Sequence, residues 1–374
     1  MKFEYIGKNS LKNIKYINKE KNYKKILIFA GKQSFSNCGA KNELKNILSK
    51  FQYEIFFKSS YLPEIADLKK FILKINSFKP NIILSIGGGS VLDLSKVANT
   101  LYGCNNIEKA IVENSYKLNK FCELIAIPTT AGSGAEATSN AVTYIENIKY
   151  SVEGNEIKPD YIIIDPNLIL STPKKIAAAA GMDAIAQSIE SLLSKKSNSE
   201  SVKYSIEALR NLLPFYENHI NNSNFESAYK MSFGALNAGR AINISKTTAP
   251  HAVSYPFTSE YKISHGHAVA ITLTDFLRFN FINISAANLK FDLNDRYKII
   301  FDEFKVTNIN ELNNKILKIA NNTGLELDLK KLNISKKSQI NNILKDINQQ
   351  RLGNNPIDLD IPTVKKILLS KIIS

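Results

Sequence analysis

The stretch NIILSIGGGSVLDLSKVA, Asn81–Ala98, decides the fold, because an apolar run, three glycines and a helical period follow one another without a break. NIILSI is rich in β-branched residues and predicts a buried strand. Glycines between a strand and a helix let the backbone approach a phosphate, and the helix start offers free N–H groups. The stretch predicts a phosphate-binding loop at Gly87–Ser90, with an ordinary tight turn as the alternative.

The chain on either side of this stretch alternates apolar runs with helical patterns. The predicted strands are Lys24–Gly31, Tyr53–Phe57, Glu123–Thr130 and Tyr161–Asp165, and the predicted helices are Cys38–Lys50, Ile65–Ser77 and Val91–Leu101. Strands that alternate with helices at this spacing indicate a parallel sheet covered by helices.

The pattern changes after Ser171–Lys175. From Ala177 onward only helical periods recur, and no comparable strand run returns. The sequence therefore predicts a domain boundary near residue 170, with an α/β domain over residues 1–170 and a mostly helical domain over residues 171–374.

Composition excludes several function classes. The net charge is +15, but the lysines are scattered and only five of the 49 basic residues are arginine, which argues against nucleic-acid binding. No apolar run reaches the ~20 residues of a membrane span, and no signal peptide is recognisable. Cys38, Cys104 and Cys122 lack metal-type spacing and are expected to be reduced thiols of a cytoplasmic protein.

A second polar loop follows the strand Glu123–Thr130. It contributes the hydroxyls of Thr129, Thr130 and Ser133, which can hydrogen-bond a ribose, an amide or a phosphate. Two such loops after neighbouring parallel strands predict a ligand crevice at the carboxyl edge of the sheet. A turn rich in Ser and Thr is the alternative.

A candidate metal site lies in the helical half. Asp183 and Gln187 are four residues apart on one predicted helix face, and three of the four histidines lie within residues 247–267. One carboxylate with His251 and His265 would suit Zn²⁺ or Fe²⁺. From spacing alone, Asp183 could equally be a helix cap and the histidines could belong to unrelated turns.

Four motifs in order carry a family resemblance: GGGSVLDLSK, IPTTAGSGAEAT, GMDAIAQSIES and HAVSYPFTSEYKISHG. Together they make the chain resemble the iron-containing (group III) alcohol dehydrogenases. The resemblance implies an α/β N-terminal dinucleotide-binding domain and an all-α C-terminal metal-binding domain, the fold shared with dehydroquinate synthases.

The resemblance also implies roles for individual residues. Asp183, His251 and His265 match the metal ligands, and His267 and His219 are expected to be a structural residue and a surface residue. A divalent metal, Fe²⁺ or Zn²⁺, and NADPH or NADH are the implied cofactors. The matched cofactor-binding positions are Gly87, Gly88, Gly89, Ser90, Asp93, Thr129, Thr130, Ser133 and Lys149.

Three positions depart from the family pattern. Gln187 replaces the fourth metal ligand, a histidine, and Tyr255 stands where a proton-relay histidine is usual. Gly31 stands in place of the acidic residue that pairs with the ribose of NAD, and Lys32 follows it. The loss of the carboxylate and the positive charge of Lys32 favour or at least permit binding of the 2′-phosphate of NADPH.

The segment before the first metal histidine is unusually polar. It carries residues that could form an anion pocket beside the metal, although a solvated helix face is the alternative: Arg240, Asn243, Lys246, Thr247 and Thr248. With the Gln187 exchange and the late stretch Ile347–Leu359, the segment resembles the branch of phosphonoacetaldehyde reductases. That resemblance implies a small anionic aldehyde as substrate.

Other interpretations remain open at this point. The chain could reduce short aldehydes generally, could be a cyclase related to dehydroquinate synthases, or could be a binding protein that has lost its metal. A glutamate would be usual in place of Asp183 in the cyclases. A homodimer is expected.

Overall fold

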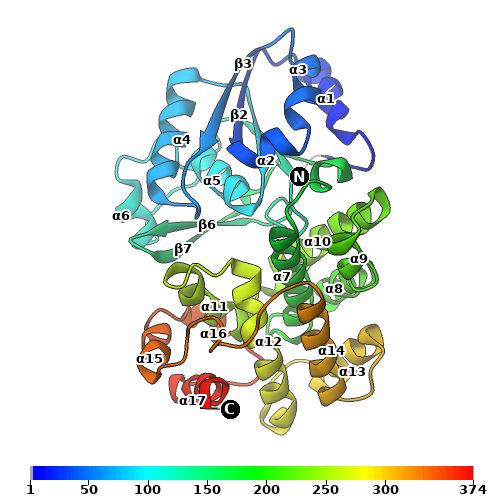
Figure 1. Ribbon diagram of the computed structural model, residues 1–374. Helices are drawn as coiled ribbons and strands as arrows, with labels where there is room; N and C mark the ends of the chain where they lie inside the picture. Colours follow the sequence, from blue (N-terminus) through cyan, green and yellow to red (C-terminus); the bar gives the residue numbers. More distant parts are fainter. Residues whose placement is uncertain (1–2, 374) are drawn as a thin grey trace. The chain divides into compact units, whose positions relative to one another are not determined.

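The structure is a computed structural model that describes residues 3–373 (Figure 1). The chain forms two compact units. The first runs up to Thr172 and includes Asn224–Ser232, and the second comprises Pro173–Ser223 and the chain from Phe233 onward. The change from strands to helices falls at the step from Thr172 to Pro173, and one helical segment returns to the first unit.

A parallel six-stranded sheet forms the centre of the first unit, in the order β1-β8-β5-β4-β2-β3. All of its neighbouring strands pair in parallel. The strands are β1 (Phe3–Ile6), β2 (Lys25–Gly31), β3 (Gln52–Lys58), β4 (Ile82–Gly87), β5 (Glu123–Pro128) and β8 (Tyr161–Ile164). The five predicted strands are confirmed in their positions, and the edge strand β1 was not predicted.

Alternation along each strand builds one core on either face of this sheet. On β2, Ile26 and Ile28 face the core beneath α1 (Ile14–Lys21), α2 (Lys32–Asn37) and α3 (Ala40–Ile47). Leu27 and Phe29 face the opposite core, which contains α4 (Ile65–Phe78), α5 (Gly89–Thr100) and α6 (Ile107–Val112). Helices therefore cover both faces, as Figure 1 shows, and strands buried on both sides explain the continuous apolar runs.

Two further details differ from the sequence prediction. The single helix predicted over Cys38–Lys50 is wrong at its start, because Gly39 has a φ of 84° and separates α2 from α3. The sequence also gave no sign of the antiparallel hairpin β6 (Asn140–Ile145) and β7 (Ile148–Glu153). Its two-residue turn, Glu146-Asn147, has φ values of 51° and 65°, as a type I′ turn requires.

The second unit is helical, as predicted. Its helix α7 (Lys174–Leu193) contacts α8 (Ser199–Leu212) and α12 (His265–Ile282) and is buried around most of its surface. The other long helices are α10 (Phe225–Ser245), whose residues up to Ser232 belong to the first unit, α11 (Ala249–Ser259), α13 (Leu293–Phe304), α14 (Ile309–Asn322) and α17 (Ile361–Ile373). Shorter helices are α9 (Tyr216–Asn221), α15 (Lys337–Lys345) and α16 (Gln349–Leu352). Within residues 3–373, no helix combines the length and the apolar character that crossing a bilayer requires.

Candidate metal and cofactor sites

Helix α12 begins directly against α7, and Gly266 makes this approach possible. A Cβ at Gly266 would lie 2.0 Å from the carbonyl oxygen of Ala179 and 2.7 Å from the Cβ of Asp183. Only a residue without a side chain fits between the two backbones. The contact places His265, the first residue of α12, beside Asp183.

Asp183, His251 and His265 converge from α7, α11 and α12, as the sequence predicted. One ligand atom from each lies within 4.8 Å of the other two, and Nε2 of His251 is 3.2 Å from Oδ1 of Asp183. Asp183 and His251 are buried. A carboxylate and two imidazoles form a donor set that suits Zn²⁺ or Fe²⁺ and leaves coordination positions for water or substrate, so the residues fit a divalent cation.

Glu190, which the sequence analysis missed, completes this arrangement. Its carboxylate contacts Nδ1 of His251 and accepts hydrogen bonds from the backbone N–H groups of Thr248 and His251. Asp183, Gln187 and Glu190 follow one another at spacings of four and three, so they share one face of α7. That spacing on an otherwise apolar helix was the signal that could have found Glu190.

His251 is held between two carboxylates. Burial opposes a charge on its ring, but the charges and hydrogen bonds of Glu190 and Asp183 prevail and raise the pKa of His251 to about 10. Metal binding at Nε2 is therefore coupled to the release of a proton.

Gln187 and Tyr255 occupy the positions where the family pattern has histidines. Nε2 of Gln187 donates to Oδ2 of Asp183 at 3.1 Å, so this buried amide orients the carboxylate. The ring of Tyr255 lies 5.8 Å from that of His265, between centroids, and Tyr255 is buried. A proton-relay role for Tyr255 stays a prediction.

The two remaining histidines are both structural. Nε2 of His267 contacts the carbonyl oxygen of Glu326 at 2.5 Å. His219 was predicted at the surface, and this is wrong: it is only 5% exposed, and burial lowers its pKa to about 4. Its place on the inner side of the short helix α9, with Nδ1 near the hydroxyl of Ser223, explains the difference.

The predicted substrate residues have mixed surroundings. Thr248 is buried and donates its hydroxyl to Glu190, and the carbonyl of Thr247 accepts from Asn354. Lys246 lies in the turn after α10 with a φ of 63°. The guanidinium of Arg240 packs over the ring of Tyr204 at 5.6 Å. These contacts of Thr248 are structural, and substrate binding by this set, Asn243 included, stays a prediction.

The two polar loops of the first unit pack against each other. A Cβ at Gly88 would lie 3.4 Å from the hydroxyl of Thr130, and a Cβ at Gly89 would lie 2.5 Å from that of Ser133. The backbone N–H of Thr129 donates to the carbonyl of Gly87 at 3.0 Å. The two loops therefore form one surface at the start of α5, where helix N–H groups and hydroxyls suit a diphosphate.

Asp93 and Lys96 on α5 brace this surface from within. Nζ of Lys96, fully buried, donates to the carbonyls of Ala135 and Asn140 at 2.8 and 2.6 Å. Oδ2 of Asp93 accepts from the N–H of Val142 at 3.1 Å. Burial raises the pKa of Asp93, and the charges of Lys96 and of Lys149 on β7 oppose that shift. The described contacts of Asp93 hold the hairpin, so its contact with a cofactor stays a prediction.

The predicted ribose end of the cofactor site lies where β2 ends. Gly31 is the last residue of β2, and Lys32, which is exposed, begins α2. The charge at this position is therefore positive and open to solvent. Ser90, at the other polar loop, is the second residue of α5 and follows Gly89.

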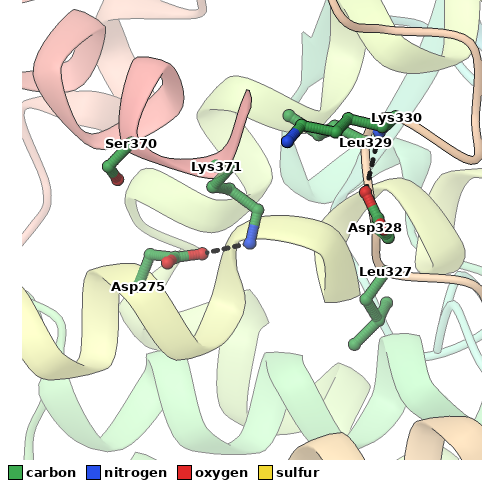
Figure 2. Close-up of a pocket in the computed structure, with 7 residues that line it drawn as sticks. All are labelled: Asp275, Leu327, Asp328, Leu329, Lys330, Ser370 and Lys371. Atoms are coloured by element: carbon green, nitrogen blue, oxygen red, sulfur yellow. Dashed lines mark hydrogen bonds and ion pairs between the residues drawn. The ribbon is translucent and has the colours of Figure 1, made fainter. Parts of the chain in front are cut away.

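A cavity of about 540 Å³ opens elsewhere on the second unit (Figure 2). It is lined by Asp275, Leu327, Asp328, Leu329, Lys330, Ser370 and Lys371. Nζ of Lys371 pairs with Oδ2 of Asp275 at 2.8 Å, and the backbone N–H of Lys330 donates to Asp328. None of the predicted site residues lines this cavity, and it is separate from the metal cluster.

Two family models match most of the chain. Residues 3–166 match the model described as iron-containing alcohol dehydrogenase, and residues 177–372 match the C-terminal model of the Fe-containing alcohol dehydrogenase family. The chain belongs to this family. Asp183, His251 and His265 are accordingly the Asp/His cluster of the family's metal site.

Individual relatives of this iron-containing family are distant. The chain is 28% identical to an aldehyde-alcohol dehydrogenase of Streptococcus pneumoniae over 62% of its own length, and it spans 28% of that relative. It is 28% identical to a phosphonoacetaldehyde reductase of Streptomyces viridochromogenes, over 55% of each chain. A solved structure of sulfoacetaldehyde reductase from Bifidobacterium kashiwanohense in complex with NAD⁺ superposes with a TM-score of 0.88. That match is 24% identical, covers 100% of this chain and 97% of the other, and shows the shared fold.

Proposed function

We propose that this member of the iron-containing family is a nicotinamide-linked reductase of small aldehydes. The observation that carries the proposal is the convergence of Asp183, His251 and His265, with ligand atoms within 4.8 Å of one another. Family membership and the two packed loops of the first unit support a nicotinamide cofactor.

When bound, a divalent cation supplies Lewis-acid polarisation of a carbonyl oxygen, and a nicotinamide supplies a hydride. Asp183, His251 and His265 would hold the cation. The hydroxyls of Thr130 and Ser133 and the start of α5 would bind the dinucleotide. Tyr255, packed on the ring of His265, would hold the proton that the product alcohol requires at its oxygen.

We further propose phosphonoacetaldehyde as the substrate, with 2-hydroxyethylphosphonate as the product. The similarity to a phosphonoacetaldehyde reductase supports this choice. The positive charges of Arg240 and Lys246, in the segment that leads into α11, suit a dianionic group. Lys32 at the end of β2 favours NADPH as the reductant, because a cation there attracts a 2′-phosphate.

The test follows NADPH and NADH oxidation with phosphonoacetaldehyde, sulfoacetaldehyde, propanal and lactaldehyde after loading with Fe²⁺ or Zn²⁺. The substrate proposal expects the highest kcat/KM for phosphonoacetaldehyde. Comparable turnover of the neutral aldehydes would replace it with general aldehyde reduction, and no turnover with either metal would indicate a binding protein without catalysis.

A variant separates charge recognition from general damage to the site. Lys246→Ala should raise the KM for phosphonoacetaldehyde at least tenfold, because a charge-assisted contact contributes about 1.5–3 kcal/mol. The KM for propanal should stay unchanged. Lys203→Ala, at an exposed lysine of α8 in the same unit, is the control. Equal effects of Lys246→Ala on both substrates would refute the anion pocket.

A further inference from the structure

Glu190 connects α7 to Thr248 and His251 beside the metal cluster through four contacts. It is 1% exposed, and its Oε1 accepts from the N–H of Thr248 at 2.9 Å and from the hydroxyl of Thr248 at 3.0 Å. The N–H of His251 also donates to Oε1, at 3.3 Å, while Oε2 contacts Nδ1 of the same histidine. One side chain of α7 thus engages both the backbone and the ring of a residue 61 positions away.

These contacts divide between the two carboxylate oxygens. Thr248 is the N-cap residue of α11, and His251 lies in its first turn. Oε1 therefore satisfies N–H groups at the start of α11, where a negative charge is also favourable to the helix dipole. Within the described part of the chain, Oε2 contacts the imidazole ring alone, so it can act on the ring independently of the cap.

We propose that Glu190 is a positioning residue that presents Nε2 of His251 to the metal cation. The inference rests on the cation site of the proposed function. A neutral imidazole that donates from Nδ1 must keep its lone pair on Nε2, so the contact with Oε2 selects the tautomer that can bind a metal there. The same contact prevents the ring from rotating away from Asp183.

Direct ligation by Glu190 is the competing interpretation, and its contacts argue against it. Both oxygens are already engaged, one by three donors and the other by the ring of His251. The carboxylate oxygen that lies with the histidine nitrogens in the metal-sized cluster belongs to Asp183. Glu190 therefore acts through His251.

The deciding variant is Glu190→Gln, which preserves size. Its amide oxygen should take the place of Oε1, where three donors converge, and so keep the cap of α11. Its NH₂ group would then face Nδ1, force that nitrogen to accept, and place the ring proton on Nε2. We expect Zn²⁺ affinity, measured by competition with a chromophoric chelator, to fall about 10–100-fold.

The urea midpoint of the metal-free protein should fall in Glu190→Gln, because the variant loses the negative charge that faces the buried ring of His251, so Zn²⁺ affinity is compared under conditions in which both proteins are folded. Ser188→Ala is the matched control, because Ser188 is also buried on α7 and donates its hydroxyl to the carbonyl of Ala184 on the same helix, at 2.8 Å. It should bind Zn²⁺ like the wild type. Wild-type Zn²⁺ affinity in Glu190→Gln, with or without lost stability, would overturn the positioning role.

A measurement on the wild type covers the case in which Glu190→Gln does not fold. In Zn²⁺-loaded protein with ¹⁵N-labelled histidine, His251 should show a protonated Nδ1 and a metal-bound Nε2. Metal binding through Nδ1 would overturn the role of Glu190 while leaving the cation site intact. A wild type that binds no Zn²⁺ would refute the cation site itself and the inference with it.

Discussion

Replacing Gly266 by alanine should separate α12 from α7 at the metal cluster. The added methyl group would meet the backbone oxygen of Ala179 at 2.0 Å and the Cβ of Asp183 at 2.7 Å. Neither atom belongs to a side chain end that could rotate away. The two helices must therefore move apart by about 1 Å to restore ordinary van der Waals contact.

This displacement has two consequences of predictable size. Overpacking of a rigid core typically costs about 1–3 kcal/mol, and a clash with backbone places Gly266→Ala at the upper end, near 3 kcal/mol. For a unit of this size, that corresponds to a melting temperature lower by about 6–12 °C. Metal–ligand distances tolerate only about 0.2 Å, so Zn²⁺ affinity should fall at least about 100-fold as His265 moves away from Asp183.

Thermal unfolding followed by circular dichroism and chelator competition with Zn²⁺ measure the two effects. Gly103→Ala is the control, because nothing lies within 4 Å of a Cβ at Gly103 and its φ is not in the left-handed region. That variant should unfold within a few tenths of a kcal/mol of the wild type. If Gly266→Ala matched the wild type in melting temperature and Zn²⁺ affinity, the close helix contact would not control the site.

Three further outcomes follow from buried or charged groups. Because burial lowers the pKa of His219 to about 4, only the unfolded chain gains a proton between pH 6.5 and 4, so stability falls as the pH falls. Relative to His219→Gln, the wild type should lose about 2 kcal/mol of unfolding free energy between pH 8 and pH 5. An equal loss in both proteins, measured by urea unfolding at each pH, would contradict this. Lys96→Met leaves two buried carbonyls and Asp93 without their cation, so the free energy of unfolding should fall by about 3–5 kcal/mol. The affinity for NADPH, measured by fluorescence titration, should fall as well. Lys32→Ala should raise the Kd for NADPH several-fold and leave that for NADH unchanged, and equal Kd changes would exclude contact with the 2′-phosphate.

Local patterns in the sequence were sufficient for the sheet, and the resemblance to a known family selected the metal ligands. The apolar runs at Ile26–Ala30 and Ile82–Ile86 predict strands wherever they lie in space, because backbone pairing and burial act on each run as a whole. Glycines between a strand and a helix are a chemical signature of the same local kind. Asp183, His251 and His265 lie on separate segments, and their assignment as ligands rested on the family resemblance. Hence the parallel sheet and the helical half could be predicted from local patterns, and Asp183 from the resemblance, before any contact was known.

Contacts between distant segments decided the rest. Glu190 meets His251 across 61 residues, and Lys96 meets Asn140 across 44, at distances that no helical or strand period encodes. In the sequence, Gly266 cannot be distinguished from the other members of a set of 16 glycines, and its role follows from the close approach of α7. His219 was expected at the surface, and the packing of α9 buries it. The sequence by itself determined which chemical groups are available. Only the tertiary structure decided which of them share a desolvated space, because burial and hydrogen bonding depend on neighbours in three dimensions.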